Sequence, residues 1–207
     1  MAPPKVIDVQ EFINSHRFSP VQVVLLVLCF FIVAIDGFDT AAIGFIAPAI
    51  RADWGLSPAQ LAPLFGSGLF GLMVGAFAIG PFADRHGRKA VLIFAVVFFG
   101  LASLASSFSP NLAVLIALRF FTGFGLGGAM PNAITLTSEY CPENRRSFLV
   151  TLMFCGFTIG SALGGVVASQ IVADYGWRSV LVVGGVLPLL LAPVLCGRCR
   201  SRSATWS

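Results

Sequence analysis

Long apolar stretches alternate with short polar segments along most of this chain. Six stretches are long enough to cross a bilayer, which takes about 20 apolar residues in a helix. We expect these spans at about residues 21–48, 60–82, 90–108, 112–137, 148–173 and 179–195. The pattern predicts an all-α membrane protein, with residues 1–20 as a polar N-terminal segment and residues 21–195 as one six-helix unit.

The basic residues between the spans lie almost entirely on one side of the expected membrane. Of the 13 Lys and Arg residues, ten share the side of the N-terminus: Lys5, Arg17, Arg85, Arg88, Lys89, Arg145, Arg146, Arg198, Arg200 and Arg202. Arg51 and Arg178 fall on the other side, and Arg119 lies inside the fourth span. Basic loop residues stay in the cytoplasm, so the sequence predicts that both termini are cytoplasmic.

Composition supports a membrane protein and excludes several functions. Apolar residues make up 57% of the 207 and charged residues 11%, less than half of the roughly 25% charged residues of a soluble domain. The net charge of +4 follows from the loop bias, so it does not indicate nucleic-acid binding. No catalytic triad, metal-ligand cluster or phosphate loop is apparent. We therefore expect neither an enzyme nor a bound metal or cofactor.

Two acids interrupt the first span. Asp36 and Asp39 follow an uncharged run and are three residues apart, so they share one face of a helix. At 1.5 Å per residue they lie about 22 and 27 Å into the span, past the midplane toward the outside. The alternative is that both acids lie in the headgroup region at the end of a short helix. Because the apolar run resumes after Thr40, we favour buried acids, which usually mark a transport pathway.

Arg119 is the charged residue of the fourth span, at a depth comparable with that of Asp36. A buried guanidinium needs a counter-ion. An acid of the first span is one candidate, and a substrate carboxylate gripped by two N–H groups is another. The alternative is that the side chain extends to the outer headgroups. The glycines that follow, from Gly123 to Gly128, fit close helix packing, because no strand precedes them as a dinucleotide loop requires.

The short loop after the second span has an ordered set of charges and glycines. Its candidate motif residues are Gly80, Asp84, Arg85, Gly87, Arg88 and Lys89. Taken alone, they make a tight cytoplasmic hairpin in which Asp84 caps the next helix or pairs with Arg88. Asn132, Glu139 and Arg145, in the stretch MPNAITLTSEYCPENRR, are candidate pocket or fourth-helix motif residues.

These motifs resemble those of the major facilitator superfamily. The loop residues match its signature, with Phe82 where Leu is usual, and Arg119 with its glycines is similar to the fourth-helix motif, whose arginine is associated with proton coupling. The stretches DGFDTAAIGFIAPAI and MPNAITLTSEYCPENRR are similar to those of the aromatic acid:proton symporters. The resemblance implies the N-terminal half of a twelve-helix transporter of the bacterial inner membrane. It also implies functional roles for Asp36 and Asp39.

Residues 196–207 depart from this resemblance, because the composition changes abruptly to Arg, Ser and Cys. We hypothesise that a frameshift or truncation near Leu195 replaced a second half. In such transporters the substrate site lies between the two halves. The expected partner is therefore a C-terminal half. A second copy is the alternative, since the halves are related by an axis along the membrane normal.

From these features we expect a proton-coupled symporter that imports an aromatic carboxylate such as 4-hydroxybenzoate, with lipid as its surroundings and the proton as coupling ion. One alternative is a truncated membrane fragment that transports nothing. Another is a superfamily transporter of a different metabolite, such as a dicarboxylate or a sugar, although acids in the first span disfavour a sugar.

Overall fold

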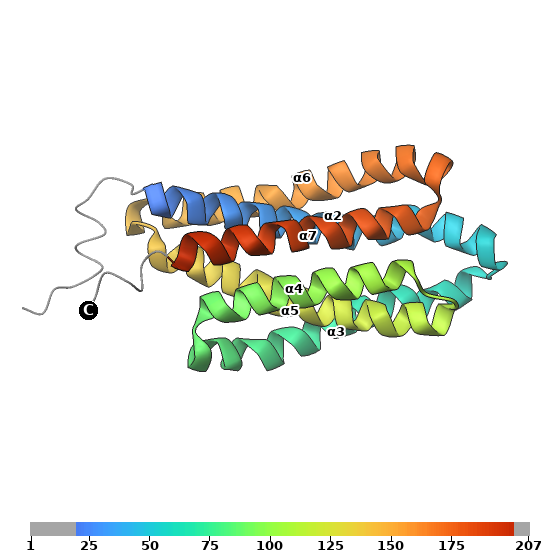
Figure 1. Ribbon diagram of the computed structural model, residues 1–207, viewed down its shortest axis with the longest axis horizontal. Helices are drawn as coiled ribbons and strands as arrows, with labels where there is room; N and C mark the ends of the chain where they lie inside the picture. Colours follow the sequence, from blue (N-terminus) through green and yellow to red (C-terminus); the bar gives the residue numbers. More distant parts are fainter. Residues whose placement is uncertain (1–19, 201–207) are drawn as a thin grey trace, which may run out of the picture.

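A computed structural model describes residues 20–200, which form six long helices lying side by side (Figure 1). The helices are α2 (Pro20–Trp54), α3 (Pro58–His86), α4 (Arg88–Ser107), α5 (Leu112–Tyr140), α6 (Glu143–Tyr175) and α7 (Trp177–Arg200). Each is long and apolar enough to span a bilayer. The described part of the chain thus confirms the predicted six-helix membrane architecture.

Most helices extend beyond the apolar spans, because polar residues that cannot lie in lipid still continue a helix. α2 runs on through Pro48 to Trp54. Pro48 has no N–H for the carbonyl of Gly44, and membrane helices tolerate such a break. α7 continues to Arg200, so residues 196–200 prolong the sixth helix. The rest of the expected tail, 201–207, and the N-terminal segment up to residue 19 lie outside the described residues.

The turns divide between the two ends of the bundle as the basic residues predict. The α3–α4 and α5–α6 turns lie at the same end as the start of α2 and the end of α7 (Figure 1). The other three turns lie at the opposite end. Gly87 and Gly176 have φ of 90° and 76°, a backbone conformation that favours glycine and permits these one-residue turns.

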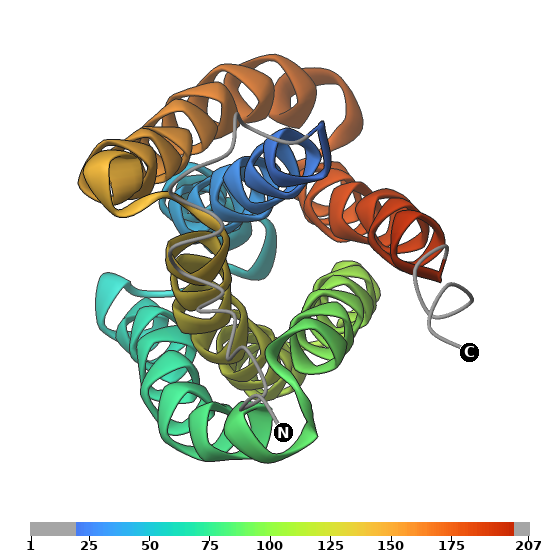
Figure 2. The same cartoon turned by 90° about the vertical axis from the view of Figure 1, so that its left-hand side faces the viewer.

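The two largest helix contacts join helices that are not neighbours in sequence. α3 packs mainly on α5 and α2 mainly on α6, while α4 lies against both α5 and α7. Figure 2, looking along the bundle, shows α2 between α6 and α7, and α5 between α3 and α4. The first three helices, α2 to α4, correspond in order to the last three, α5 to α7. Under this exchange the α2–α6 contact corresponds to the α5–α3 contact, and the α4–α5 contact corresponds to the α7–α2 contact. This is the arrangement of two interleaved three-helix repeats.

Glycines permit the closest of these contacts. A Cβ at Gly75 of α3 would meet the backbone carbonyl of Phe124 of α5, and one at Gly160 of α6 would meet that of Ala34 of α2. Lipid offers no hydrophobic driving force between helices, so such backbone contact supplies much of the attraction. The glycines therefore set the spacing of the two main helix pairs.

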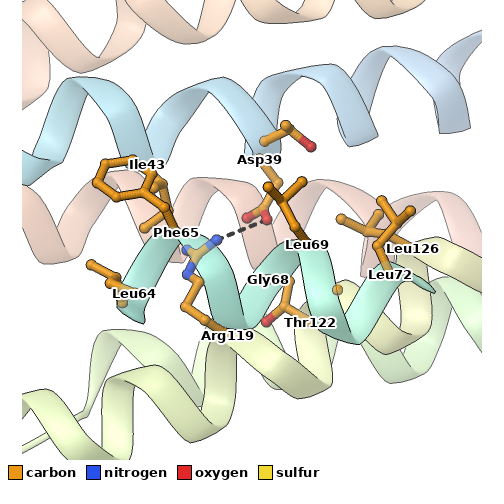
Figure 3. Close-up of a pocket in the computed structure, with 12 residues that line it drawn as sticks. Asp39, Ile43, Leu64, Phe65, Gly68, Leu69, Leu72, Arg119, Thr122 and Leu126 are labelled. Atoms are coloured by element: carbon orange, nitrogen blue, oxygen red, sulfur yellow. Dashed lines mark hydrogen bonds and ion pairs between the residues drawn. The ribbon is translucent and has the colours of Figure 1, made fainter. Parts of the chain in front are cut away.

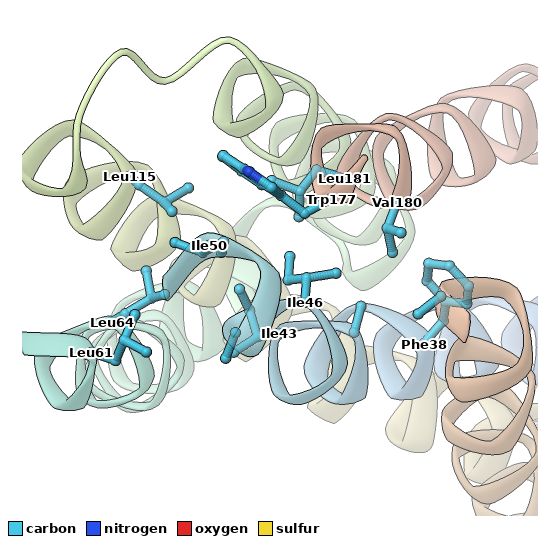
Figure 4. Packing of buried hydrophobic residues seen from close by; sticks show 13 residues of the cluster. Phe38, Ile43, Ile46, Ile50, Leu61, Leu64, Leu115, Trp177, Val180 and Leu181 are labelled. Atoms are coloured by element: carbon cyan, nitrogen blue, oxygen red, sulfur yellow. The ribbon is translucent and has the colours of Figure 1, made fainter. Parts of the chain in front are cut away.

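An apolar cluster joins five helices near the non-cytoplasmic end (Figure 4). Ile46 and Ile50 of α2 pack with Leu115 of α5 and with Trp177 of α7, and all four are buried. The Trp177 indole N–H donates to Asp53 at 3.2 Å, so the ring keeps a polar partner while its body is buried. This cluster holds α2 against α5 and α7 and thereby fixes the helices that carry the buried charges.

The helix-spacing role of Gly75 predicts a difference between two similar substitutions in α3. Gly75→Ala should destabilise the fold by about 1–3 kcal/mol, because the added methyl overpacks the α3–α5 contact. Gly66→Ala, on the same helix, has nothing within 4 Å of the added methyl. It should be neutral or stabilising by up to about 1 kcal/mol, through helix propensity. Unfolding of the purified chain in mixed detergent micelles measures both, and equal effects would contradict the packing argument.

Candidate functional site

An ion pair between α2 and α5 lies in the interior of the bundle. Arg119 Nη1 donates to Asp39 Oδ2 at 2.9 Å, and the two residues are 4% and 2% exposed (Figure 3). Arg119 therefore does not extend to the outer headgroups. Its partner is an acid of the first span, and the pair lets both charges stay away from water, because each supplies the counter-charge that the other needs.

The second oxygen of Asp39 has its own partner, from a third helix. Ser103 of α4 donates to Asp39 Oδ1 at 3.2 Å, and its Oγ also lies 3.4 Å from the carbonyl oxygen of Leu181 in α7. Four helices thus meet at one carboxylate. Such multiple hydrogen bonding fixes the orientation of the carboxylate toward Arg119.

Asp36 is as deeply buried as Asp39 but has fewer hydrogen-bond partners. It is 2% exposed and accepts a hydrogen bond from Thr40, one turn along α2, at 3.3 Å. In the described part of the chain no basic side chain forms an ion pair with it. α2 continues to Trp54, so neither acid lies at the end of a short helix.

Arg119 uses only part of its hydrogen-bonding capacity. Its Nε and Nη2 atoms are buried and have no hydrogen-bond partner within the described structure. These two N–H groups lie on the same edge of the planar guanidinium, the geometry that matches the two oxygens of a carboxylate. Buried donors without partners are costly, about 1–3 kcal/mol each. The described chain thus leaves two donors of Arg119 without a hydrogen-bond partner.

A cavity of about 230 Å³ adjoins this ion pair. Arg119, Asp39, Thr40 and Thr122 contribute its polar atoms, and α3 contributes apolar side chains. The apolar side chains that line it are Ile43, Leu64, Phe65, Leu69, Leu72 and Leu126 (Figure 3). A mostly apolar pocket with a few convergent polar groups is typical of a site for a small organic molecule.

The charged loop residues form a separate cluster at the cytoplasmic end. Arg88 contacts Asp84 at 3.0 Å and Glu139 at 3.1 Å, and so joins the α3–α4 turn to the end of α5. Of the two roles expected for Asp84, the structure shows pairing with Arg88, because α4 has Gly87 as its N-cap and no side-chain cap. Arg85 and Lys89 are exposed, and a side chain at Gly80 would have open space.

The other candidates do not line the cavity around Arg119. Asn132 is buried and donates to the carbonyl of Gly128 in its own helix at 2.6 Å. Arg145 is exposed in the first turn of α6. Asn132 and Arg145 lie near the superfamily-like motifs in sequence, but neither lies at the ion pair of Asp39 and Arg119.

Three hydroxyl residues at the site were absent from the sequence-based candidates: Thr40, Ser103 and Thr122. The sequence feature that could have identified them is a hydroxyl side chain within an apolar span. This feature is ambiguous, because such hydroxyls commonly donate a hydrogen bond to a backbone carbonyl of their own helix. Ser106, one turn after Ser103, does so with the carbonyl of Ala102 at 2.8 Å.

The ion pair predicts a strongly non-additive double-mutant cycle. Asp39→Leu should cost about 3–5 kcal/mol, because it leaves Arg119 buried and charged. Arg119→Met should cost less, because a carboxyl group can neutralise itself with a proton while a guanidinium cannot lose one. The double variant should be more stable than Asp39→Leu alone. Unfolding free energies in mixed micelles measure the coupling, and additive effects would argue against a stabilising pair.

Comparison with known proteins agrees with this architecture. The family model of the Major Facilitator Superfamily matches residues 29–204. The 4-hydroxybenzoate transporter PcaK of Pseudomonas aeruginosa is 56% identical over 192 residues, which are 93% of this chain and 43% of that protein. The gallate transporter of Pseudomonas putida is 50% identical over 91% of this chain and 42% of its own length. The chain thus spans less than half of the length of these curated relatives.

The inward-open xylose transporter XylE of Escherichia coli has a similar fold. Its TM-score is 0.72 at 21% identity, over 85% of this chain and 48% of that one. At this identity the likeness concerns the fold alone. Together with six membrane-spanning helices in the described residues, the family match over most of the sequence shows that the chain belongs to the major facilitator superfamily, as a multi-pass protein of the bacterial inner membrane.

Proposed function

We propose that this chain is the N-terminal half of a proton-coupled symporter that imports an aromatic carboxylate such as 4-hydroxybenzoate. The observation that carries the proposal is the unpaired edge of Arg119, buried beside an apolar cavity. The relatives described above, which are named for 4-hydroxybenzoate and gallate, support the substrate class.

The geometry suggests how the substrate is held. The carboxylate accepts from Nε and Nη2 of Arg119, while Nη1 keeps its hydrogen bond to Asp39. The ring lies against the apolar lining from α3, including Phe65 and Leu69. An apolar ring and a charged end thus meet different parts of one cavity, an arrangement that would favour aromatic acids over sugars.

Charge balance supplies the coupling to protons. Without substrate, Asp39 and Arg119 neutralise each other. A substrate carboxylate adds a second negative charge to the single guanidinium, and an uncompensated charge away from water is costly. A proton on Asp39 restores neutrality, so substrate and proton are expected to bind together. Asp36, which has no basic partner among the described residues, offers a second place for a proton.

Because the chain spans less than half of its relatives, a second half has to complete the cavity. We propose that a C-terminal half fills this place, since substrate sites in such transporters lie between halves. A second copy of the chain is the alternative occupant. Transport by the chain alone tests this alternative directly.

The proposal predicts uptake of labelled 4-hydroxybenzoate into right-side-out vesicles that contain the chain together with the remaining C-terminal part of the Pseudomonas aeruginosa relative. Accumulation should require a proton gradient and be abolished by a protonophore. Unlabelled benzoate should compete for uptake and xylose should not. Asp39→Asn should lower uptake at least tenfold, because it removes the proton-accepting carboxylate.

Asp174→Asn provides the matched control, since Asp174 is an exposed acid at the outer end of α6. Its uptake should equal that of the unaltered chain. Equal uptake by the Asp39 and Asp174 variants would remove Asp39 from the mechanism. Uptake by the chain alone would favour paired copies, and no uptake with either partner would favour a chain that does not transport.

A further inference from the structure

Ser103 lies at a junction of three helices and has two acceptors within reach. Its side chain is fully buried, with 0% exposure. Its Oγ is 3.2 Å from Asp39 Oδ1 of α2 and 3.4 Å from the carbonyl oxygen of Leu181 of α7. A hydroxyl has one hydrogen and two lone pairs. Both distances are long for an O–H···O bond, as expected when one hydrogen serves two acceptors.

The hydroxyl of Ser103 would use these two acceptors in different protonation states of Asp39. When Asp39 is a carboxylate, Ser103 donates its hydrogen to Oδ1. When Oδ1 holds a proton, the carboxylic acid becomes the donor and Ser103 Oγ becomes the acceptor. The hydrogen of Ser103 then turns to the Leu181 carbonyl, which has a second lone pair free beside its helix bond. Every donor keeps a partner, and only one O–H bond rotates.

We infer that Ser103 is a positioning residue that keeps Asp39 hydrogen-bonded in both its charged and its neutral form. This inference rests on the proposed proton-carrying role of Asp39. Without such a partner, gain and loss of a proton would alternately leave a buried donor or acceptor unsatisfied, at about 1–3 kcal/mol. With Ser103 present, the site changes charge without moving its helices.

The packing around the carboxylate leaves room for this exchange. A Cβ at Gly184 of α7 would lie 3.3 Å from Asp39 Oδ1 and 3.5 Å from Ser103 Oγ. The absence of a side chain there keeps the hydroxyl and carboxylate free of an apolar cover. Within residues 20–200, the ionisable groups near Asp39 are Asp36 on its own helix and Arg119 from α5. α4 and α7 bring a hydroxyl and a carbonyl, and the cavity lining from α3 is apolar.

Infrared spectroscopy of the purified chain in lipid vesicles tests this inference without any substrate. Difference spectra between acidic and neutral pH contain the C=O stretch of each carboxyl group that takes a proton. The band lost in Asp39→Asn belongs to Asp39. In Ser103→Ala we expect this band at a higher frequency, because the neutral acid has lost a hydrogen-bond partner.

Ser106→Ala is the matched control, because Ser106 lies on the same helix, has 0% exposure and bonds only the carbonyl of Ala102 among the contacts described. Its Asp39 band should stay in place. Should Ser103→Ala not fold, Ser103→Cys keeps the side-chain size with a weaker donor and should shift the band in the same direction by less.

An Asp39 band that does not move in either Ser103 variant overturns the inference, as does the absence of any band sensitive to Asp39→Asn. The uptake experiment is independent of this result. Absent uptake with a shifted band would overturn the transport proposal alone. Proton-driven uptake that depends on Asp39, with an unshifted band, would overturn the role of Ser103 alone.

Discussion

The ion pair between Asp39 and Arg119 is the constraint on which the rest of the bundle interior depends. Each charge is costly in lipid by itself, so the finished bundle is most stable when α2 and α5 are held in a fixed register. The apolar cluster around Trp177 and the glycines of the two main helix pairs provide that register. Asp39 accepts from Nη1 of Arg119, and the other edge, Nε and Nη2, has no hydrogen-bond partner among the described residues.

The two charged regions of the chain have different physical functions. At the cytoplasmic end, Arg88 joins Asp84 and Glu139 where water screens the charges, so each contact contributes little stability. Around Asp39 the same kinds of groups are buried, and each unpaired atom has a large effect on free energy. The proposed transport cycle would use both, because a proton site has to be sensitive to charge, while a contact between helix ends has to break and form easily.

The sequence predicts most of the fold but only part of the site. Apolar length and loop charge are one-dimensional properties, so six helices and their orientation follow directly. Depth along a helix led from Arg119 to the acids of the first span but did not choose between Asp36 and Asp39, and the structure pairs Arg119 with Asp39. Which acid pairs with Arg119 depends on how α2 is rotated about its axis relative to α5, and the periodicity of the sequence does not determine this rotation. Ser103 and Ser106 look equivalent in the run ASLASS, and only the packing of α4 on α2 and α7 distinguishes them.

The interleaving of the two repeats also has a consequence for biosynthesis. Asp39 precedes Arg119 by 80 residues, and α6, the main neighbour of α2, begins later still, at Glu143. At about 5–20 residues per second, the ribosome adds Arg119 about 4–16 s after Asp39, so α2 enters the membrane before its counter-charge is available. The apolar residues of α2 therefore have to retain two acids in the bilayer by themselves. Their hydrophobicity is set by the needs of insertion as well as by those of the finished bundle.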